Sequence, residues 1–154
     1  GHISVDENGP RCKCGNVGCI ETLASINAMA EKYRELISKT HPDASENTID
    51  ENFDALLQGA HEGDQTCLKI FKGAAKSLGK AIGYLINAFN PQTSVIGKKF
   101  PKYSELVLDD IALSASKTAL THLAESCSIV PSSFGENSSA LGAAIIPVRK
   151  LFGK

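Results

Sequence analysis

Three cysteines near the start of the chain are the residues best suited to chemistry. Cys12, Cys14 and Cys19 fall within eight positions, and His2 stands ten residues before the first of them. Thiolates and imidazole are the ligands that zinc takes in closed tetrahedral structural sites, and three cysteines with one histidine form a common set. The spacing therefore predicts a structural zinc site.

The residues around these cysteines favour the tight bend that such a site needs. Gly15 and Gly18 flank the bend and tolerate positive φ, and Pro10 fixes the direction of the chain ahead of it. The alternatives are a disulfide and a chance cluster, but three cysteines cannot all pair with one another, and a Cys-x-Cys pair has poor disulfide geometry. Spacing alone leaves His2 open as a ligand, because Gly1-His2 also fits the remnant of a purification tag.

The same stretch carries a resemblance to a known family. From Gly1 to Ser25 the chain reads Gly-His-x-x-Val-Asp-x-x-Gly-x-x-Cys-x-Cys-Gly-Asn-x-Gly-Cys-x-Glu-Thr-x-Ala-Ser. This dense pattern resembles the ROK family, which comprises bacterial sugar-responsive repressors, uncharacterised reading frames and sugar kinases. A less specific similarity continues through Asn90-Pro91-Gln92 and the stretch 139–144, so the resemblance covers nearly the whole chain.

The resemblance implies a zinc site and a sugar site that share a residue. In the ROK family the histidine and three cysteines hold a structural zinc, which implies a zinc knuckle over residues 2–21. The implied ligands are His2, Cys12, Cys14 and Cys19. The family's histidine, and the glutamate two residues beyond the last cysteine, also touch the sugar. The implied sugar-binding residues are therefore His2 and Glu21.

Length and composition indicate one globular domain. The chain has 154 residues, of which 42% are hydrophobic and 21% charged, and its formal net charge of −1 does not favour a nucleic-acid surface. No apolar run approaches the roughly 20 residues that span a bilayer, and no signal peptide opens the chain. Cys67 and Cys127 are interpreted as small core residues, and free and zinc-bound thiols indicate a cytoplasmic protein. Because the chain starts inside a motif and without methionine, we expect a fragment of a longer protein.

Apolar residues recur at helical spacing over much of the chain. A helix is expected from about residue 21 or 25 to 39, then a loop over 41–47, then a helix that Thr48 and Glu51 open as a capping box. The longest helix is predicted over about 64–90, with Gly79 and Gly83 one turn apart so that another backbone can approach closely. We expect this helix to pack centrally on a sheet through one apolar stripe: Leu68, Phe71, Ala75, Leu78, Ile82, Leu85 and Phe89.

Short strands alternate with these helices, which indicates an α/β unit. Strands are predicted over 3–5, 94–97 and 128–130, the second of them buried through Val95 and Ile96. Further helices are predicted over 103–120 and 138–151, and the small residues of the last one suit tight packing. The family resemblance implies that residues 1–154 form a single unit, the helix-rich C-terminal lobe of an actin-like (ribonuclease H-like) ATPase fold. The nucleotide loop and catalytic aspartate would lie upstream, in a first lobe.

A loop at residues 97–101 distinguishes the two activities of the family. Its sugar kinases usually carry a Gly-Gly-Gly loop there, whose backbone amides close around nucleotide phosphates. Here the run is Gly97-Lys98-Lys99-Phe100-Pro101, so we expect the close backbone cradle to be lost. The two lysines are interpreted as part of a solvated loop, with electrostatic attraction of an anion as the alternative.

The resemblance therefore favours a sugar-sensing effector domain of a ROK-family transcriptional repressor, of the N-acetylglucosamine or glucose type. The alternative is the C-terminal lobe of an ATP-dependent hexose or N-acetylhexosamine kinase, although this chain shows no catalytic residue for phosphotransfer. A free-standing zinc-knuckle interaction domain would carry exposed aromatic residues near the knuckle, and residues 1–30 contain none. The expected partners are a sugar or sugar phosphate and further copies of the chain, in a homodimer or higher oligomer. DNA would be bound only through an N-terminal domain, and no membrane is involved.

Overall fold

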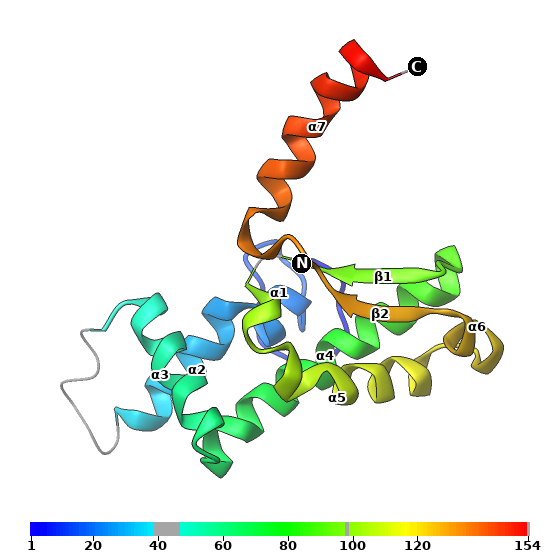
Figure 1. Ribbon diagram of the computed structural model, residues 1–154. Helices are drawn as coiled ribbons and strands as arrows, with labels where there is room; N and C mark the ends of the chain where they lie inside the picture. Colours follow the sequence, from blue (N-terminus) through cyan, green and yellow to red (C-terminus); the bar gives the residue numbers. More distant parts are fainter. Residues whose placement is uncertain (39–46, 98, 154) are drawn as a thin grey trace.

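The computed structural model describes residues 1–38, 47–97 and 99–153, with Glu136 described by its backbone alone. Helices predominate among them, and η2 and η3 are short 3-10 turns. The elements in chain order are α1 (Ile20–Ala24), α2 (Ile26–Ile37), α3 (Ile49–His61), α4 (Gln65–Phe89), β1 (Thr93–Ile96), η2 (Phe100–Lys102), α5 (Ser104–Thr118), α6 (Thr121–Ser126), β2 (Ser128–Pro131), η3 (Gly135–Asn137) and α7 (Ser138–Phe152) (Figure 1). The loop predicted over 41–47 lies outside the described residues except for Asn47, and so does Lys98.

Helix α4 is the scaffold around which helices α1, α2, α3, α5 and α6 pack. Helix α5 runs along it, and α1, α2 and α3 also contact it (Figure 1). The Asp64 carboxylate caps its start by accepting from the backbone N–H groups of Thr66 and Cys67, at 2.7 and 2.9 Å. It ends at Asn90, whose φ of 45° is left-handed, ahead of Pro91. The predicted limits of this helix, about 64–90, are confirmed.

Two glycines allow α5 to lie against α4. A Cβ added at Gly79 would overlap the carbonyl oxygen of Ile111. One added at Gly83 would lie 2.6 Å from the Cβ of Thr118 and 2.9 Å from the carbonyl oxygen of Ala115. The predicted close approach of another backbone at these glycines is confirmed, and the approaching element is α5.

The predicted packing of α4 on a sheet is wrong, because α4 packs chiefly on α5. The buried side of α4 is therefore rotated relative to the predicted stripe. Ala81 and Ile86 are buried, whereas Leu85 and Phe89 are 38% and 75% exposed. Two helices approach most closely where small residues let their backbones meet. Gly79 and Gly83 are such residues, so the side of α4 that carries them faces α5.

Strands β1 and β2 form a two-stranded parallel sheet, with Thr93 opposite Ser128 and α5 and α6 in the crossover between them. The strands predicted over 94–97 and 128–130 are confirmed. Val95 was expected to be buried but is 63% exposed, because the helices cover only one face of this sheet (Figure 1). Helix α6 was not predicted, since it has no buried residue and hence no apolar period to detect.

Local sequence explains where α2 and α3 begin. Thr48 and Glu51 form the predicted capping box ahead of α3. Ser25 has extended backbone, with φ −70° and ψ 158°, and its side chain accepts from the N–H of Ala28. Of the two starts expected for the helix that runs towards residue 39, the one at residue 25 is confirmed, because Ser25 caps α2. The start at residue 21 is wrong: residues 20–24 form the separate short helix α1, which Ser25 ends.

Aromatic side chains form the centre of the main core. Phe53 of α3, Phe71 of α4, Phe100 of η2 and Tyr103 are all buried. Their ring centroids lie 5.3–6.2 Å apart, mostly edge to face. Aromatic pairs of this geometry stabilise a protein by more than the burial of their apolar surface alone, and here they hold three helical elements together.

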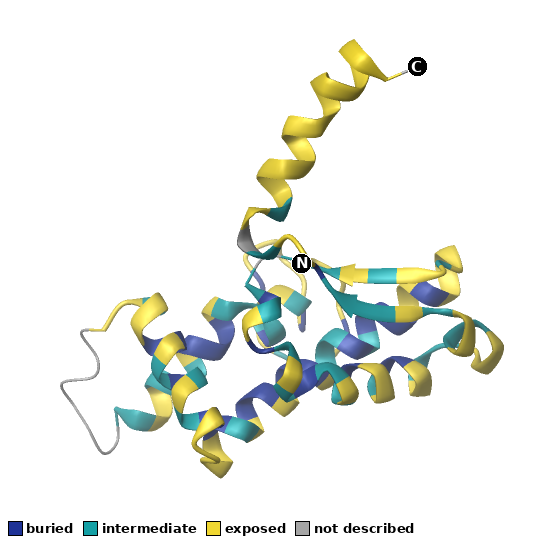
Figure 2. Cartoon of the chain, viewed as in Figure 1, coloured by how far each residue is buried: buried dark blue, intermediate teal, exposed yellow. Residues whose placement is uncertain are grey.

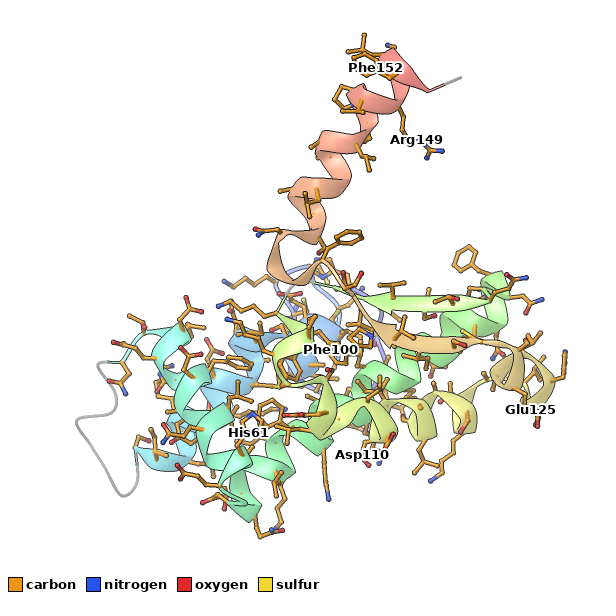
Figure 3. All side chains as sticks on the ribbon, viewed as in Figure 1. His61, Phe100, Asp110, Glu125, Arg149 and Phe152 are labelled. Carbon is orange, nitrogen blue, oxygen red and sulfur yellow. The ribbon has the colours of Figure 1, made fainter. Side chains whose placement is uncertain are left out.

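Helix α7 projects away from the rest of the protein (Figure 1) and is exposed over almost its whole length (Figure 2). None of its residues is buried, so the tight packing expected for its small residues is not found within the described structure. Arg149 and Phe152 lie towards its outer end, far from Phe100 in the core (Figure 3). No helix in the described part of the chain combines the length and apolar character needed to cross a membrane.

We predict that Gly79→Ala destabilises the protein, because its methyl group would collide with the Ile111 carbonyl oxygen. Overpacking of this kind costs about 1–3 kcal/mol. Gly73 is the matched control in the same helix, where an added Cβ meets nothing within 4 Å. Gly73→Ala should stabilise by up to about 1 kcal/mol through helix propensity. Urea unfolding of both variants measures the difference, and a Gly79→Ala variant as stable as Gly73→Ala would contradict the close packing.

Candidate metal centre

The start of the chain is tied by its backbone to the segment that follows the cysteines. The N–H of Glu21 donates to the Gly1 carbonyl oxygen at 2.8 Å, and the N–H of Ile20 donates to that of Ile3 at 3.0 Å. Both chain neighbours of His2 are therefore held by hydrogen bonds. This pairing places the imidazole beside the cysteines, although His2 is the second residue of the chain.

The pairing is shorter than the strand predicted over 3–5. Only an isolated antiparallel bridge forms, between Ser4 and Cys19, with a hydrogen bond of 2.9 Å from the Val5 N–H to the Gly18 carbonyl oxygen. The prediction of a strand is wrong because the paired segments diverge after a few residues: one continues into the knuckle and the other enters α1.

A tight turn places the cysteines close together. The Cys12 N–H donates to the carbonyl oxygen of Asn16 at 2.8 Å, and the Gly15 N–H donates back to that of Cys12 at 3.0 Å. Gly15 and Gly18 have φ values of +97° and +62°, as the sequence predicted for this bend. At Gly18 a side chain is also excluded by space, since a Cβ would overlap the carbonyl oxygen of Asp6.

The four predicted ligands converge on one point. Their ligand atoms all lie within 4.8 Å of one another. The Sγ of Cys12 is 3.6 Å from the Nδ1 of His2, and the Sγ of Cys14 is 3.6 Å from the Sγ of Cys19. In a tetrahedral site with Zn–S bonds of about 2.3 Å and Zn–N bonds of about 2.0–2.1 Å, neighbouring ligand atoms lie about 3.5–3.8 Å apart. The donor set and these two spacings fit zinc.

The cysteines form no disulfide, and their surroundings set the protonation of two of the knuckle thiols. All the cysteines of the chain are free. Burial raises the pKa of the Cys19 thiol to about 12, whereas the backbone N–H of Asn16 and the neighbouring Cys12 lower the pKa of Cys14. Without a metal ion, Cys19 therefore holds its proton at neutral pH. A metal ion binds thiolates, so its binding must release that proton.

A lysine and a small apolar cluster attach the knuckle to α4. The Nζ of Lys80 donates to the Val5 carbonyl oxygen at 2.5 Å. The side chain of Val5 is buried with Leu23 and Ala81, and Ile20 packs against them. Sequence reasoning missed this attachment, because Lys80 lies 75 residues from Val5 and no local pattern marks a lysine that donates to a distant carbonyl.

The two predicted sugar-binding residues face one surface groove beside the cysteines. His2, Glu21 and Cys12 line it, together with charged side chains from the knuckle and α2: Arg11, Lys13, Glu31, Lys32 and Glu35. No ion pair within 4.0 Å involves Glu21 in the part of the chain that the structure describes. Its carboxylate instead lies against Gly1, where an added Cβ would be 2.6 Å from Oε2. Glu21 is thus exposed and available to a ligand in the groove.

The segment predicted to distinguish a kinase from a regulator is filled by a large side chain. Phe100 is 3% exposed, and its ring lies 5.3 Å from that of Tyr103. The Nζ of Lys99 pairs with the Asp50 carboxylate at 2.6 Å, and this pairing lowers the pKa of Asp50. Lys99 is therefore engaged with α3 and is not simply a solvated loop residue.

The remaining candidate residues lie apart from the knuckle. Cys67 is buried in α4, and burial raises the pKa of its thiol to about 11. Cys127 is half-buried at the edge of the main core, against which it packs, and its Sγ lies 3.6 Å from the Ser94 hydroxyl. Neither thiol belongs to the metal-binding group found among the described residues.

Comparison with known proteins agrees with the resemblance in the sequence. The profile of the ROK family matches residues 1–150. The chain is 30% identical over 149 residues to the DNA-binding transcriptional repressor Mlc of Escherichia coli, covering 95% of this chain and 36% of the repressor. It is 29% identical over 157 residues to a glucokinase of Thermotoga maritima, covering 99% of this chain and 50% of the enzyme.

Solved structures show the same two classes of relative. A ROK family transcriptional regulator, described as a homologue of the E. coli Mlc protein, superposes with a TM-score of 0.78 at 30% identity, over 95% of this chain and 37% of its own. A ROK family glucokinase from Streptomyces griseus, in complex with glucose and AMPPNP, gives a TM-score of 0.76 at 25% identity, over 95% of this chain and 49% of its own. The chain thus spans between about a third and a half of these relatives.

We predict one zinc ion per chain, bound by the four knuckle residues. Elemental analysis of protein purified without chelator should find it, and His2→Ala and Cys14→Ser should each lower its occupancy. Cys127→Ser is the control and should retain the metal ion, because Cys127 lies outside the cluster. Since the ligands must be deprotonated, zinc should be lost on acidification. Metal-free protein at neutral pH, or a Cys12–Cys19 disulfide, would contradict the assignment.

The two knuckle glycines should respond differently to substitution. Both have positive φ, so alanine introduces similar backbone strain at either position. Only at Gly18 would the added methyl group also overlap the Asp6 carbonyl oxygen, whereas Gly15 has nothing within 4 Å. Gly18→Ala should therefore weaken zinc binding at least tenfold more than Gly15→Ala, as measured by competition with a chromogenic chelator. Equal affinities would show that Gly18 is not closely packed.

Proposed function

The chain belongs to the ROK family, and from that premise we propose that it is the sugar-sensing effector part of a transcriptional regulator, stabilised by structural zinc. In this proposal His2, Cys12, Cys14 and Cys19 hold the zinc. The sugar is bound by His2 and Glu21. The observation that carries the proposal is that both sugar-binding residues line one groove with the ligand Cys12.

The orientation of His2 supports a role in both sites. Its Nδ1 lies toward the cysteines, 3.6 Å from the Cys12 sulfur. The second ring nitrogen is then available to a sugar hydroxyl. Because the partner of one imidazole nitrogen determines whether the other carries a proton, binding at Nδ1 would also fix the hydrogen bond that the second nitrogen can make. A bound zinc would supply a cross-link that fixes the ring and the loop. The carboxylate of Glu21 would accept hydrogen bonds from further hydroxyl groups.

The segment after β1 favours a regulator over a kinase. Backbone amides can surround phosphate groups only where side chains leave room for them, as glycines do. Here Gly97 is followed after two lysines by Phe100, which is buried, and Lys99 is paired with Asp50. This arrangement offers no comparable run of bare amides to a nucleotide.

The proposal extends to parts of the protein beyond this chain, because the chain spans 36% of the Mlc repressor. We propose that residues 1–154 form one lobe, with zinc knuckle 2–21, and that a second lobe completes the sugar site. DNA would be bound by a separate N-terminal domain, and the protein would act as a homodimer or higher oligomer. Sugar binding would then change the position of the lobes and, through the oligomer, of the DNA-binding domains.

An ATP-dependent sugar kinase is the second candidate. The observation that favours it is the likeness to glucokinases, one of which superposes with a TM-score of 0.76. Under this alternative Glu21 and His2 would still bind the sugar. The nucleotide loop and the catalytic base would come from the rest of the protein.

We predict that Glu21→Gln lowers the affinity of the full-length protein for its sugar at least tenfold. The substitution keeps the size of the side chain but removes the charge that accepts hydroxyl groups. Hydrogen bonds to charged groups contribute about 1.5–3 kcal/mol, and 1.4 kcal/mol corresponds to a factor of ten in affinity. Isothermal titration with glucose and N-acetylglucosamine measures the change.

Glu35→Gln is the matched control, because Glu35 lines the same groove but lies on α2. Its sugar affinity should stay within about twofold of the wild type. Zinc content and melting temperature should be unchanged in both variants. Unchanged sugar affinity in Glu21→Gln would remove Glu21 from the site and leave it as a residue of the first turn of α1, where the helix dipole favours an acid by about 0.3–1 kcal/mol.

A regulator should not transfer phosphate. We predict that the full-length protein, incubated with ATP and either glucose or N-acetylglucosamine, forms no sugar phosphate above the level of a Glu21→Gln preparation purified in parallel. This chain alone should also show no sequence-specific DNA binding. ATP-dependent phosphorylation that is lost in the variant would establish the kinase alternative.

A further inference from the structure

The three knuckle cysteines differ in their access to solvent. Cys12 and Cys19 are 5% and 0% exposed, whereas Cys14 is exposed. Cys14 precedes Gly15 at the tip of the turn, where an added Cβ would meet nothing within 4 Å. A small oxidant in solution therefore reaches the sulfur of Cys14 before it reaches the other two.

The exposed sulfur also has a buried partner at short range. The Sγ of Cys14 is 3.6 Å from the Sγ of Cys19. Cys12 also lies within 4.8 Å of both sulfurs, but its Sγ is 3.6 Å from the Nδ1 of His2, and a Cys-x-Cys pair such as Cys12 and Cys14 has poor disulfide geometry. A disulfide bond is about 2.03–2.05 Å long, so an approach of about 1.5 Å would close it. The four residues between the two cysteines include Gly15 and Gly18, whose backbone freedom favours this movement.

We propose that Cys14 and Cys19 form a peroxide-reactive pair whose oxidation to a disulfide expels the metal ion from the knuckle. The thiolate of Cys14 attacks one oxygen of hydrogen peroxide. The O–O bond breaks, which leaves a sulfenic acid on Cys14 and a hydroxide that becomes water. The thiolate of Cys19 then attacks the Cys14 sulfur, the S–S bond forms, and the S–O bond breaks to release a second hydroxide. The two sulfurs together lose two electrons, and peroxide gains them.

The disulfide removes two of the four ligands at once. His2 and Cys12 would remain, and two protein ligands do not complete a closed tetrahedral zinc site. The other thiols lack such a partner: Cys67 is buried in α4, and the polar neighbour of Cys127 is the hydroxyl of Ser94. Within the described residues, the knuckle is thus the place where oxidation can form an internal disulfide and release a metal ion.

The consequence for the sugar rests on the function proposed above. Glu21 lies two residues beyond Cys19, and its N–H is held by the Gly1 carbonyl oxygen next to His2. Loss of the metal ion would free the imidazole and loosen this pairing. Oxidation would therefore lower the sugar affinity and make the response to sugar depend on peroxide.

The test adds hydrogen peroxide in increments to zinc-loaded full-length protein. Released zinc is followed with a chromogenic chelator, and disulfides are mapped by peptide mass spectrometry. We expect about one zinc ion to be released for each molecule of peroxide consumed, together with a Cys14–Cys19 disulfide. Dithiothreitol should reduce this disulfide, and added zinc should then bind again. Retention of zinc while peroxide is consumed would overturn the proposal. So would a disulfide to Cys12, or a sulfinic acid at Cys14 without any disulfide.

Cys14→His separates metal binding from oxidation, because histidine is also a zinc ligand but cannot form a disulfide. It should require at least tenfold more peroxide to release zinc than the wild type. Cys127→Ser keeps the knuckle and should release zinc as the wild type does. If Cys14→His fails to bind zinc, the disulfides mapped in oxidised Cys127→Ser still test the proposal: a Cys14–Cys19 disulfide supports it, and any other disulfide contradicts it.

Titration of the oxidised protein with sugar distinguishes this proposal from the function on which it rests. Zinc release with a Cys14–Cys19 disulfide but unchanged sugar affinity would support the redox pair and contradict the sugar site. If the protein forms no such disulfide but its sugar binding depends on Glu21, the redox pair is contradicted and the proposed sugar site stands.

Discussion

The convergence of three sulfur atoms and one imidazole within 4.8 Å is the constraint on which the first part of the structure depends. The knuckle has almost no apolar core of its own, since Val5 is the one large apolar side chain that it buries before α1. Its shape rests on backbone hydrogen bonds and on Gly15 and Gly18, which adopt the backbone conformations that the turn requires. A segment of this kind needs a cross-link to be rigid, and a tetrahedral metal ion held by these four residues would supply one.

Helix α4 connects this knuckle to the rest of the protein. Three consecutive residues do so in different ways: Gly79 contacts α5, Lys80 donates to the Val5 carbonyl oxygen, and Ala81 joins the small apolar cluster behind the knuckle. A movement of the knuckle would therefore act on the same turn of α4 that packs against α5. If Glu21 binds a ligand, as proposed, this contact offers a physical route from that ligand to the helices packed on α4.

Some of this structure could be predicted from the sequence, because its causes are local. Metal ligation demands particular residue types at short spacing, so the cluster of three cysteines was predicted from the sequence. Spacing left His2 open, and the family resemblance added it to the set. The structure brings all four residues together. Helix α3 follows from its capping box, and the limits of α4 follow from Asp64 and Asn90. Whether the cluster binds zinc, and whether Glu21 binds sugar, stay predictions.

Other features depend on partners far away in the chain, and here sequence reasoning was wrong or had no signal. The buried side of α4 follows from its contact with α5, which the apolar stripe alone does not reveal. Val95 is exposed because no helix covers its face of the sheet in the described structure, and α7 is exposed because no described element packs beside it. The bond between Lys80 and Val5 joins residues 75 positions apart and leaves no local pattern.

If the metal ion organises the sugar site, its removal must weaken sugar binding. The full-length protein would be titrated with sugar by calorimetry as purified, after treatment with a chelator, and after zinc is restored. Metal content and folding would be verified in each state. We predict that sugar affinity falls at least tenfold on removal of zinc and returns when zinc is added back. Equal sugar affinity in verified metal-free and zinc-loaded protein would contradict it.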